Sequence, residues 1–180
     1  MSNFLLKAVP EGGLAHPYLA SGLSLRQPLF RSGKLSQQPV DSFGAMNRSA
    51  DWFHQAQADL QQASLSAESG FHEWACFACH QAVEKALKAL HLHLGQQAWG
   101  HGLGRSYRDL PAETVVQLAA AVPDLEDRLR ILDALYIPTR YPDSLPDGAP
   151  TDHFGRLQSE DALRHARALI ESIRAALAQA

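Results

Sequence analysis

The sequence predicts an all-α protein: an up-and-down bundle of four long helices and one short helix, with a proline-rich loop before the last helix. From residue 46 onward, apolar residues recur at spacings of three and four, which is the period of an amphipathic helix. No segment shows the alternation of apolar and polar residues that a half-buried strand needs. The chain has 180 residues, of which 46% are hydrophobic, and this suits one domain with a substantial core.

The first two helices are the clearest, because a glycine ends each of them. The first has an apolar stripe that begins at Trp52, and Gly70 ends it. The second is expected over residues 71–94, with Gly95 as its stop. Several alanines in its stripe suggest that neighbouring helices approach it closely. The stripe consists of Phe71, Trp74, Ala78, Ala82, Ala86, Leu90 and Leu94.

Three more helices are predicted after a glycine-rich connector, WGHGLGRS. A short helix over 112–122 ends at Pro123, and Asp124 is placed to cap the next helix, whose stripe reaches Tyr136. Four prolines between positions 138 and 150 exclude a helix there. Ser159 is expected to cap the last helix. The core face of that helix consists of Leu163, Ala166, Ile170, Ile173 and Leu177.

Residues 1–45 differ from the rest of the chain. They contain four prolines and five glycines with no sustained period, so we expect a disordered appendage to a helical domain over 46–180. A second hypothesis is that translation begins at Met46, which directly precedes the first helical pattern. A tryptic peptide from residues 8–26 in the native protein would refute that hypothesis.

Charge and composition exclude several classes of protein. The net charge is −3, and from Met46 onward 12 basic residues stand against 17 acidic ones. This balance lacks the basic footprint of a dedicated DNA-binding module. No apolar run approaches the roughly 20 residues that span a bilayer, and the N-terminus is a poor signal peptide. We therefore expect a cytoplasmic protein with no membrane contact.

Cys76, Cys79 and His80 formally match the C-x-x-C-H pattern of covalent haem attachment. They lie within a strong amphipathic helix, however, which favours packing roles for the two thiols. Two thiolates and one imidazole are also too few for a structural zinc site, which takes four ligands. His91 and His93 point roughly 200° apart on a helix and cannot chelate together. We predict neither a metal nor a haem cofactor.

Four segments of the chain carry a family resemblance. They are WFHQAQADL at 52–60, CHQAVEKALKA at 79–89, YIPTRYPD at 136–143, and the Glu160-Asp161-Ala162 start of the last helix. In this order they resemble the HEPN family, the higher eukaryotes and prokaryotes nucleotide-binding domain, and the resemblance extends from about Met46 to Leu177. It implies a helical domain that binds a nucleotide.

The candidate binding residues lie on two of these segments. Gln81 begins a polar strip on the second helix. In the structural interpretation, this strip is a solvated helix face with a salt bridge. In the functional interpretation, one of its lysines faces the TRYPD loop. In that loop, Arg140 has the planar fork that suits phosphate, and Tyr141 offers a flat face for a base. An ion pair between Arg140 and Asp143 is the structural alternative. The candidate nucleotide-binding residues are Glu84, Lys85, Lys88, Arg140, Tyr141 and Asp143.

Many HEPN proteins are ribonucleases that use an Arg-x4–6-His motif near the start of the last helix. Here no histidine follows Arg140 at that spacing, and His153 lies beyond three further prolines. Arg48 and His54 have the spacing, but they lie at the start of the first helix. The ribonuclease site is therefore expected to be absent.

The resemblance then implies a non-catalytic, dimeric nucleotide-binding protein. Its partner would be a minimal nucleotidyltransferase in a two-component or toxin–antitoxin arrangement. The alternatives are a metal-independent ribonuclease toxin, acting on RNA with Arg140 and a displaced His153, and a helical dimerisation module that binds no ligand.

Overall fold

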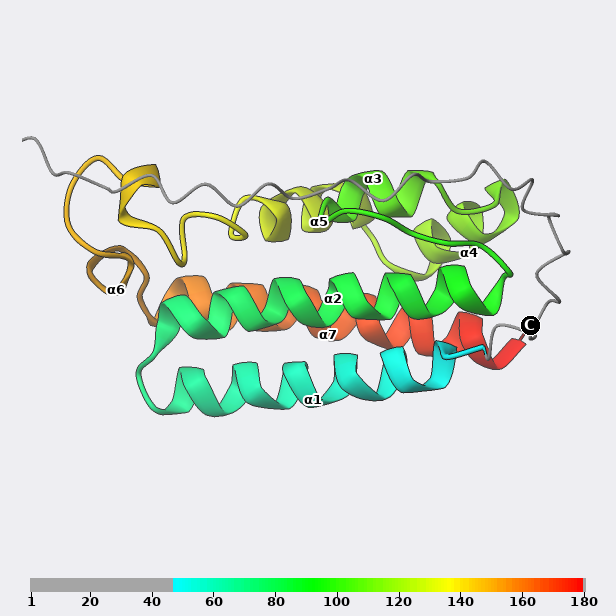
Figure 1. Ribbon diagram of the computed structural model, residues 1–180, viewed down its shortest axis with the longest axis horizontal. Coiled ribbons are helices and arrows are strands. Elements are labelled where there is room, and N and C mark those ends of the chain that lie inside the picture. The colour runs from blue at the N-terminus through cyan, green and yellow to red at the C-terminus, as the bar shows by residue number, and fades with distance from the viewer. Residues whose placement is uncertain (1–46, 180) are drawn as a thin grey trace, which may run out of the picture. The chain divides into compact units, whose positions relative to one another are not determined.

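The computed structural model describes residues 47–179, and these form the all-helical domain that the sequence predicts (Figure 1). The appendage predicted for residues 1–45 and the proposed start at Met46 lie outside the described residues. The helices are α1 (Ser49–Glu68), α2 (His72–His93), α3 (Leu103–Arg108), α4 (Ala112–Ala121), α5 (Leu125–Asp133), α6 (Pro150–His153) and α7 (Arg156–Gln179), with a 3-10 turn at Pro142–Ser144.

The three long helices α1, α2 and α7 lie side by side, and α2 is in contact with both of the others (Figure 1). The shorter helices α3, α4 and α5 lie on the side of α2 and α7 that faces away from α1. Helices α3 and α5 pack on α2, and α4 and α5 pack on α7. Helix α2 is thus the central element, and 13 of its 22 residues are buried. Side chains placed on α2 can reach α1, the connector to α3 and the proline-rich loop.

Small residues at the helix seams allow this close packing. Ala56 and Ala63 of α1 and Ala82 and Ala86 of α2 are completely buried, as the alanine-rich stripe predicts. Larger side chains from α2, α3, α4, α5 and α7 fill the space between the long helices and the shorter ones. The largest buried ones are Leu87, Leu90, Leu103, Leu118, Leu129, Leu132, Ile170 and Ile173.

The bundle has three long helices and not the predicted four. Helix α5 has only 9 residues, and Tyr136 lies after its end. The physical reason is Pro138, which lacks an N–H group and disfavours helical geometry at the residue before it. Residues 134–141 continue as hydrogen-bonded turns. The Thr139 hydroxyl donates to the Leu135 carbonyl oxygen at 2.6 Å, and Arg140 Nε donates to that of Tyr136 at 2.9 Å.

Two predicted caps are wrong. Asp124 precedes α5 as expected, but its backbone adopts a left-handed φ of 55° and its side chain makes no capping hydrogen bond. Helix α7 begins at Arg156, three residues before the predicted cap. Ser159 is instead buried within its first turns, where its hydroxyl donates to the Arg156 carbonyl oxygen and lies 2.9 Å from His72 Nδ1.

Two short helices lie where the sequence predicts none. Helix α3 lies in the glycine-rich connector, and Asp133 of α5 caps it, because its carboxylate accepts hydrogen bonds from the backbone N–H groups of Leu103, at 2.7 Å, and Gly104, at 3.0 Å. Helix α6 is a single turn in the proline-rich loop. It tolerates Pro150 because that residue occupies the first turn, where no N–H partner is needed.

Candidate functional site

Arg140 of the TRYPD loop lies against three aromatic rings. Its Cζ atom is 4.3 Å from the ring centroid of Tyr136, 4.5 Å from that of Phe77 and 4.9 Å from that of Tyr141. We call these three rings the arginine cage. Arg140 Nε also donates a hydrogen bond to the Tyr136 carbonyl oxygen, so the orientation of the guanidinium group is fixed. No ion pair or hydrogen bond within residues 47–179 engages its two terminal nitrogens.

Asp143 does not neutralise this arginine. It is exposed at the 3-10 turn, and no ion pair joins it to Arg140 in the described structure. Tyr141 is 51% exposed, so part of its ring is open to solvent. The loop therefore presents a half-buried, oriented guanidinium group that has no carboxylate partner among the described residues.

Glu84 forms a second polar centre on α2. Its side chain is only 8% exposed, and its carboxylate accepts hydrogen bonds from Lys88 Nζ at 2.6 Å, His101 Nδ1 at 3.1 Å and Gln81 Nε2 at 3.1 Å. Burial alone would raise the pKa of the Glu84 carboxyl, but the hydrogen bonds from Lys88 and His101 outweigh burial and lower this pKa. Glu84 is a carboxylate at neutral pH.

Stacked rings connect these two centres. The His101 ring lies parallel to the Tyr136 ring, with centroids 4.9 Å apart, and the fully buried His80 ring is 4.7 Å from the same tyrosine. Glu84 thus holds His101, which stacks on Tyr136, and Tyr136 forms one wall of the arginine cage. Sequence reasoning missed His101 and did not include Tyr136 among the binding residues. The only available signal was the family motif around Tyr136.

His80 is buried without full hydrogen bonding. Its Nε2 atom has no hydrogen-bond partner among the described residues and lies 3.5 Å from Asp133 Oδ1. Burial lowers the pKa of the His80 imidazole and outweighs the opposing effect of the nearby Glu84 and Asp133 carboxylates. His80 is therefore neutral at physiological pH.

The two candidate lysines, Lys85 and Lys88, have different partners. Lys85 forms an ion pair with Asp59 of α1, whereas Lys88 bonds to Glu84 and lies 5.4 Å from the centroid of the Trp52 ring. Neither ammonium group makes a hydrogen bond or ion pair with the TRYPD loop in the part of the chain that is described. The structural interpretation of the polar strip is confirmed in one respect, since Glu84 and Lys88 do form the helix salt bridge.

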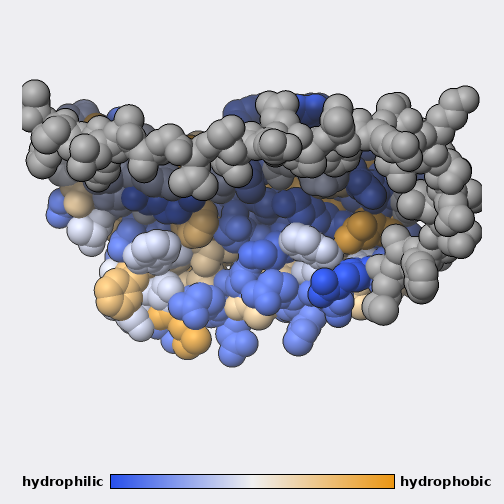
Figure 2. All heavy atoms as spheres, viewed as in Figure 1, coloured by the Kyte–Doolittle hydropathy of each residue, from blue (hydrophilic) through white to orange (hydrophobic). Residues whose placement is uncertain are grey.

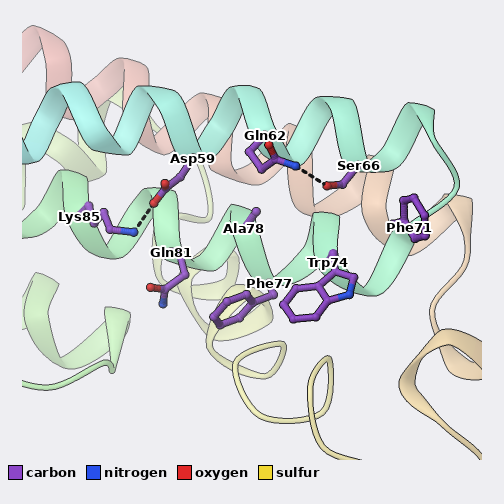
Figure 3. Close-up of a pocket in the computed structure, with 9 residues that line it drawn as sticks. All are labelled: Asp59, Gln62, Ser66, Phe71, Trp74, Phe77, Ala78, Gln81 and Lys85. Atoms are coloured by element: carbon purple, nitrogen blue, oxygen red, sulfur yellow. Dashed lines mark hydrogen bonds and ion pairs between the residues drawn. The ribbon is translucent and has the colours of Figure 1, made fainter.

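A groove of about 570 Å³ lies between α1 and α2 (Figure 3). Its volume falls in the range of small-molecule sites. Phe77 lines this α1–α2 groove and also forms one wall of the arginine cage, so Arg140 borders the groove through a shared ring. The groove is lined by Asp59, Gln62, Ser66, Phe71, Trp74, Phe77, Ala78, Gln81 and Lys85.

The aromatic end of the groove corrects the predicted core stripe of α2. Phe71 and Trp74 were expected in the core but are 57% and 52% exposed. Figure 3 shows Trp74 and Phe77 next to each other on α2, and Figure 2 shows hydrophobic side chains gathered near the α1–α2 turn. The signal for this second face was in the sequence, because Trp74, Phe77, Gln81 and Lys85 follow at spacings of 3, 4 and 4.

The candidate ribonuclease pairs are not assembled. His153 Nε2 is 2.6 Å from the carbonyl oxygen of Asp147 in its own loop, and no contact in the described structure joins it to Arg140. Arg48 forms an exposed ion pair with Asp51 at the start of α1. Within the described part of the chain, neither arginine has a histidine at hydrogen-bond distance.

The two cysteines are packing residues, as predicted. Both are free and completely buried in the core. Burial raises the pKa of the Cys76 thiol to about 12 and also raises that of Cys79, so neither is a thiolate near neutral pH. Within residues 47–179, no group of three potential ligands is arranged to hold a metal ion. No helix of this part is long and apolar enough to cross a membrane.

Comparison with known proteins agrees with this architecture. The model of the HEPN domain matches residues 49–176. The chain therefore belongs to the HEPN domain family. A comparison with curated proteins gives no match.

The chain is similar to several solved structures, among them those of three proteins. The first, TT1696 from Thermus thermophilus, is 43% identical with a TM-score of 0.67, and the match covers 72% of this chain and 98% of that one. ST0689, an archaeal HEPN homologue, is 28% identical with a TM-score of 0.58, over 72% and 98% of the two chains. A HEPN domain protein from Thermotoga maritima, tm0613, is 28% identical with a TM-score of 0.51, over 72% and 99%.

Proposed function

We propose that this HEPN protein binds a nucleotide at the junction of the α1–α2 groove and the arginine cage, with the phosphate on Arg140 and the base in the groove. The observation that carries the proposal is the guanidinium group of Arg140, which is oriented by three rings and has no carboxylate partner among the described residues. The domain is acidic overall, so such a cation marks a local site for an anion.

The geometry of Arg140 suits a phosphate group. Its Nε is occupied by the Tyr136 carbonyl oxygen, which leaves the edge with the two terminal nitrogens for a bidentate contact. A hydrogen bond to a charged group contributes about 1.5–3 kcal/mol. Little side-chain entropy is lost on binding, because the cage already orients the fork.

The groove supplies surfaces for a base. Phe71 and Trp74 are each about half exposed, and Phe77 continues the aromatic wall toward Arg140. Stacking on an aromatic side chain contributes about 1–3 kcal/mol per base. Tyr141 offers a further ring at the loop side, and Asp143 remains a candidate on the same loop.

The other predicted residues take different roles in this proposal. Lys85 belongs to the groove wall, where it is paired with Asp59. Glu84 and Lys88 act at a distance, because Glu84 holds His101 against Tyr136. They support the arginine cage without contacting the nucleotide.

Calorimetric titration with AMP, ADP and ATP tests the proposal. Replacing Arg140 by Ala is expected to weaken binding at least tenfold, and R140K is expected to restore only part of it, because lysine lacks the fork. Trp74→Ala should weaken binding about tenfold. Arg156→Ala is the matched control, since Arg156 forms an exposed ion pair with Glu160 and does not line the groove.

Two outcomes would contradict the proposal. No heat with any of the three nucleotides would favour a dimerisation module without a ligand. Metal-independent cleavage of RNA that His153→Ala abolishes would favour a ribonuclease instead.

We further propose a homodimer that acts beside a small nucleotidyltransferase, as the resemblance to non-nucleolytic HEPN proteins implies. The separate contacts of Arg140 and His153 support the non-catalytic part of this proposal. Light scattering should give twice the mass of one chain, and a nucleotidyltransferase encoded beside this gene should co-purify with it. A monomeric mass, or a neighbouring nucleotidyltransferase that does not co-purify, would contradict this part.

A further inference from the structure

A second hollow, of about 390 Å³, lies beside the connector between α2 and α3. It shares no lining residue with the α1–α2 groove. We call it the tryptophan hollow, and it is lined by Trp52, Lys88, Leu92, Gln97, Ala98, Trp99 and Gly100. Nothing in the proposed nucleotide site uses its two indole rings.

Trp99 is the most exposed large apolar side chain of the described structure, at 85%. It lies on the connector between Gly95 and Gly100, both of which have a left-handed backbone with φ of 72° and 88°. Leaving an indole ring in water forgoes the burial that apolar surface favours. Its position at the wall of a hollow suggests that a ligand covers it.

Lys88 is the one charged residue among those that line the hollow. Its Nζ atom lies 5.4 Å from the Trp52 ring centroid and donates one hydrogen bond, at 2.6 Å, to Glu84. An ammonium group has three donors, and no other hydrogen bond within residues 47–179 uses the remaining two. The hollow thus combines two indole rings with a cation that can still donate.

We propose that the tryptophan hollow binds a planar aromatic anion, with the ring against Trp52 and Trp99 and the negative group on Lys88. A flat ring is favoured because indole faces stack on planar π-systems. A cationic ligand is disfavoured by Lys88 itself.

A long polyanion is disfavoured as well. Such a ligand needs several available cations, but the other two basic residues on this face are taken up by ion pairs: Lys85 with Asp59 and Arg48 with Asp51. Such a surface lacks the excess positive charge that binds nucleic-acid chains. The negative group of the ligand is either a carboxylate or a single phosphate, and two probes distinguish these sources.

The three tryptophans of the chain allow both sites to be followed in one experiment. Trp74 lines the α1–α2 groove, whereas Trp52 and Trp99 line the tryptophan hollow. Each indole N–H gives its own signal in a ¹H–¹⁵N spectrum, and single Trp→Phe variants assign the three signals. The probes are 2-naphthoate for an aromatic carboxylate and AMP for an aromatic phosphate.

We expect 2-naphthoate to shift the signals of Trp52 and Trp99 and to leave that of Trp74 in place. The neutral 2-naphthamide and the non-planar cyclohexanecarboxylate should bind at least tenfold more weakly. Lys88→Met and Trp99→Ala should each weaken 2-naphthoate at least tenfold. The Trp99→Ala variant is expected to fold normally, because the side chain it removes is almost entirely exposed.

The AMP arm identifies the source of the anion. If AMP shifts Trp52 and Trp99, and Trp99→Ala weakens the shift at Trp52 while the signal of Trp74 still moves, the hollow accepts an aromatic phosphate. If only 2-naphthoate shifts the signals of Trp52 and Trp99, the ligand is an aromatic carboxylate. Either result supports the site.

The inference fails if neither probe shifts Trp52 and Trp99 at millimolar concentration, or if 2-naphthamide binds as well as 2-naphthoate. This outcome is separate from the proposed nucleotide site, whose failure would show as an unmoved Trp74 signal with AMP. Conversely, Arg140→Ala should remove the AMP shift at Trp74 and leave 2-naphthoate binding unchanged within twofold.

Discussion

Arg140 serves the fold and the proposed site with different parts of one side chain. Its Nε satisfies the Tyr136 carbonyl oxygen in the turn that follows α5, where helical hydrogen bonds end. Its planar face packs against the arginine cage, and its outer edge stays open. A lysine could not divide its role in this way, because an ammonium group has no planar face.

His80 yields a prediction about pH at the residue scale. Because burial lowers the pKa of its imidazole in the folded state, the unfolded chain binds a proton more readily. The free energy of unfolding should therefore fall as the pH drops below about 6.5, the ordinary value for histidine. Urea unfolding at several pH values between 7.5 and 5 measures this slope.

His80→Gln should reduce that slope even if it lowers stability at every pH. His54→Gln is the matched control, because it replaces a histidine that is exposed on α1. An equal slope in the parent and His80→Gln proteins would contradict the buried, neutral imidazole.

At the scale of elements, the seam between α1 and α2 depends on small side chains. Ala63 of α1 is completely buried, whereas Ala58 on the same helix is exposed. Ala63→Leu should lower the free energy of unfolding by about 1–3 kcal/mol, because a larger side chain overpacks the seam. Ala58→Leu should change it by less than about 0.5 kcal/mol. Denaturant titrations of both variants test the packing, and equal effects would contradict it.

The cap of α3 gives a second prediction at this scale. Asp133→Ala removes both hydrogen bonds to the Leu103 and Gly104 amides and should cost about 0.5–2 kcal/mol of stability. The same two amides should exchange faster with deuterated water. Asp127→Ala is the control, because Asp127 forms only an exposed ion pair with Arg130 in the described structure. Unchanged exchange at both amides would show that Asp133 is not the cap.

The predictable elements are those with a long stripe and a clear stop. Helices α1 and α2 lie where they are predicted and end beside Gly70 and Gly95, which adopt left-handed conformations. Helix α3 has too few residues for a period, and its start depends on Asp133, 30 positions away in the sequence. The end of α5 depends on Pro138, whose effect on the preceding turn outweighs the apolar spacing that reaches Tyr136.

At the scale of the whole molecule, the α1–α2 groove, the tryptophan hollow and the oriented Arg140 lie in a surface on which most charged side chains are paired. This domain is a HEPN fold shared with TT1696 from Thermus thermophilus. Its α2 helix is central, so one element contributes to the core, the groove, the arginine cage and the tryptophan hollow.

The candidate site was only partly predictable from the sequence, because the contacts of the central helix α2 involve residues far away in the chain. Arg140 and Tyr141 belong to a motif and could be named from the sequence. The partners of the polar side chains of α2 depend on the tertiary arrangement. Lys85 pairs with Asp59 of α1, and Glu84 pairs with His101 of the connector. No local pattern contains those partners.

The most direct measurement of the central proposal is a crystal structure of the protein with AMP. We expect the phosphate oxygens within hydrogen-bond distance of the two terminal nitrogens of Arg140, and the adenine ring against Trp74 in the α1–α2 groove. AMP bound elsewhere, with the outer edge of Arg140 still free, would contradict the proposed nucleotide site.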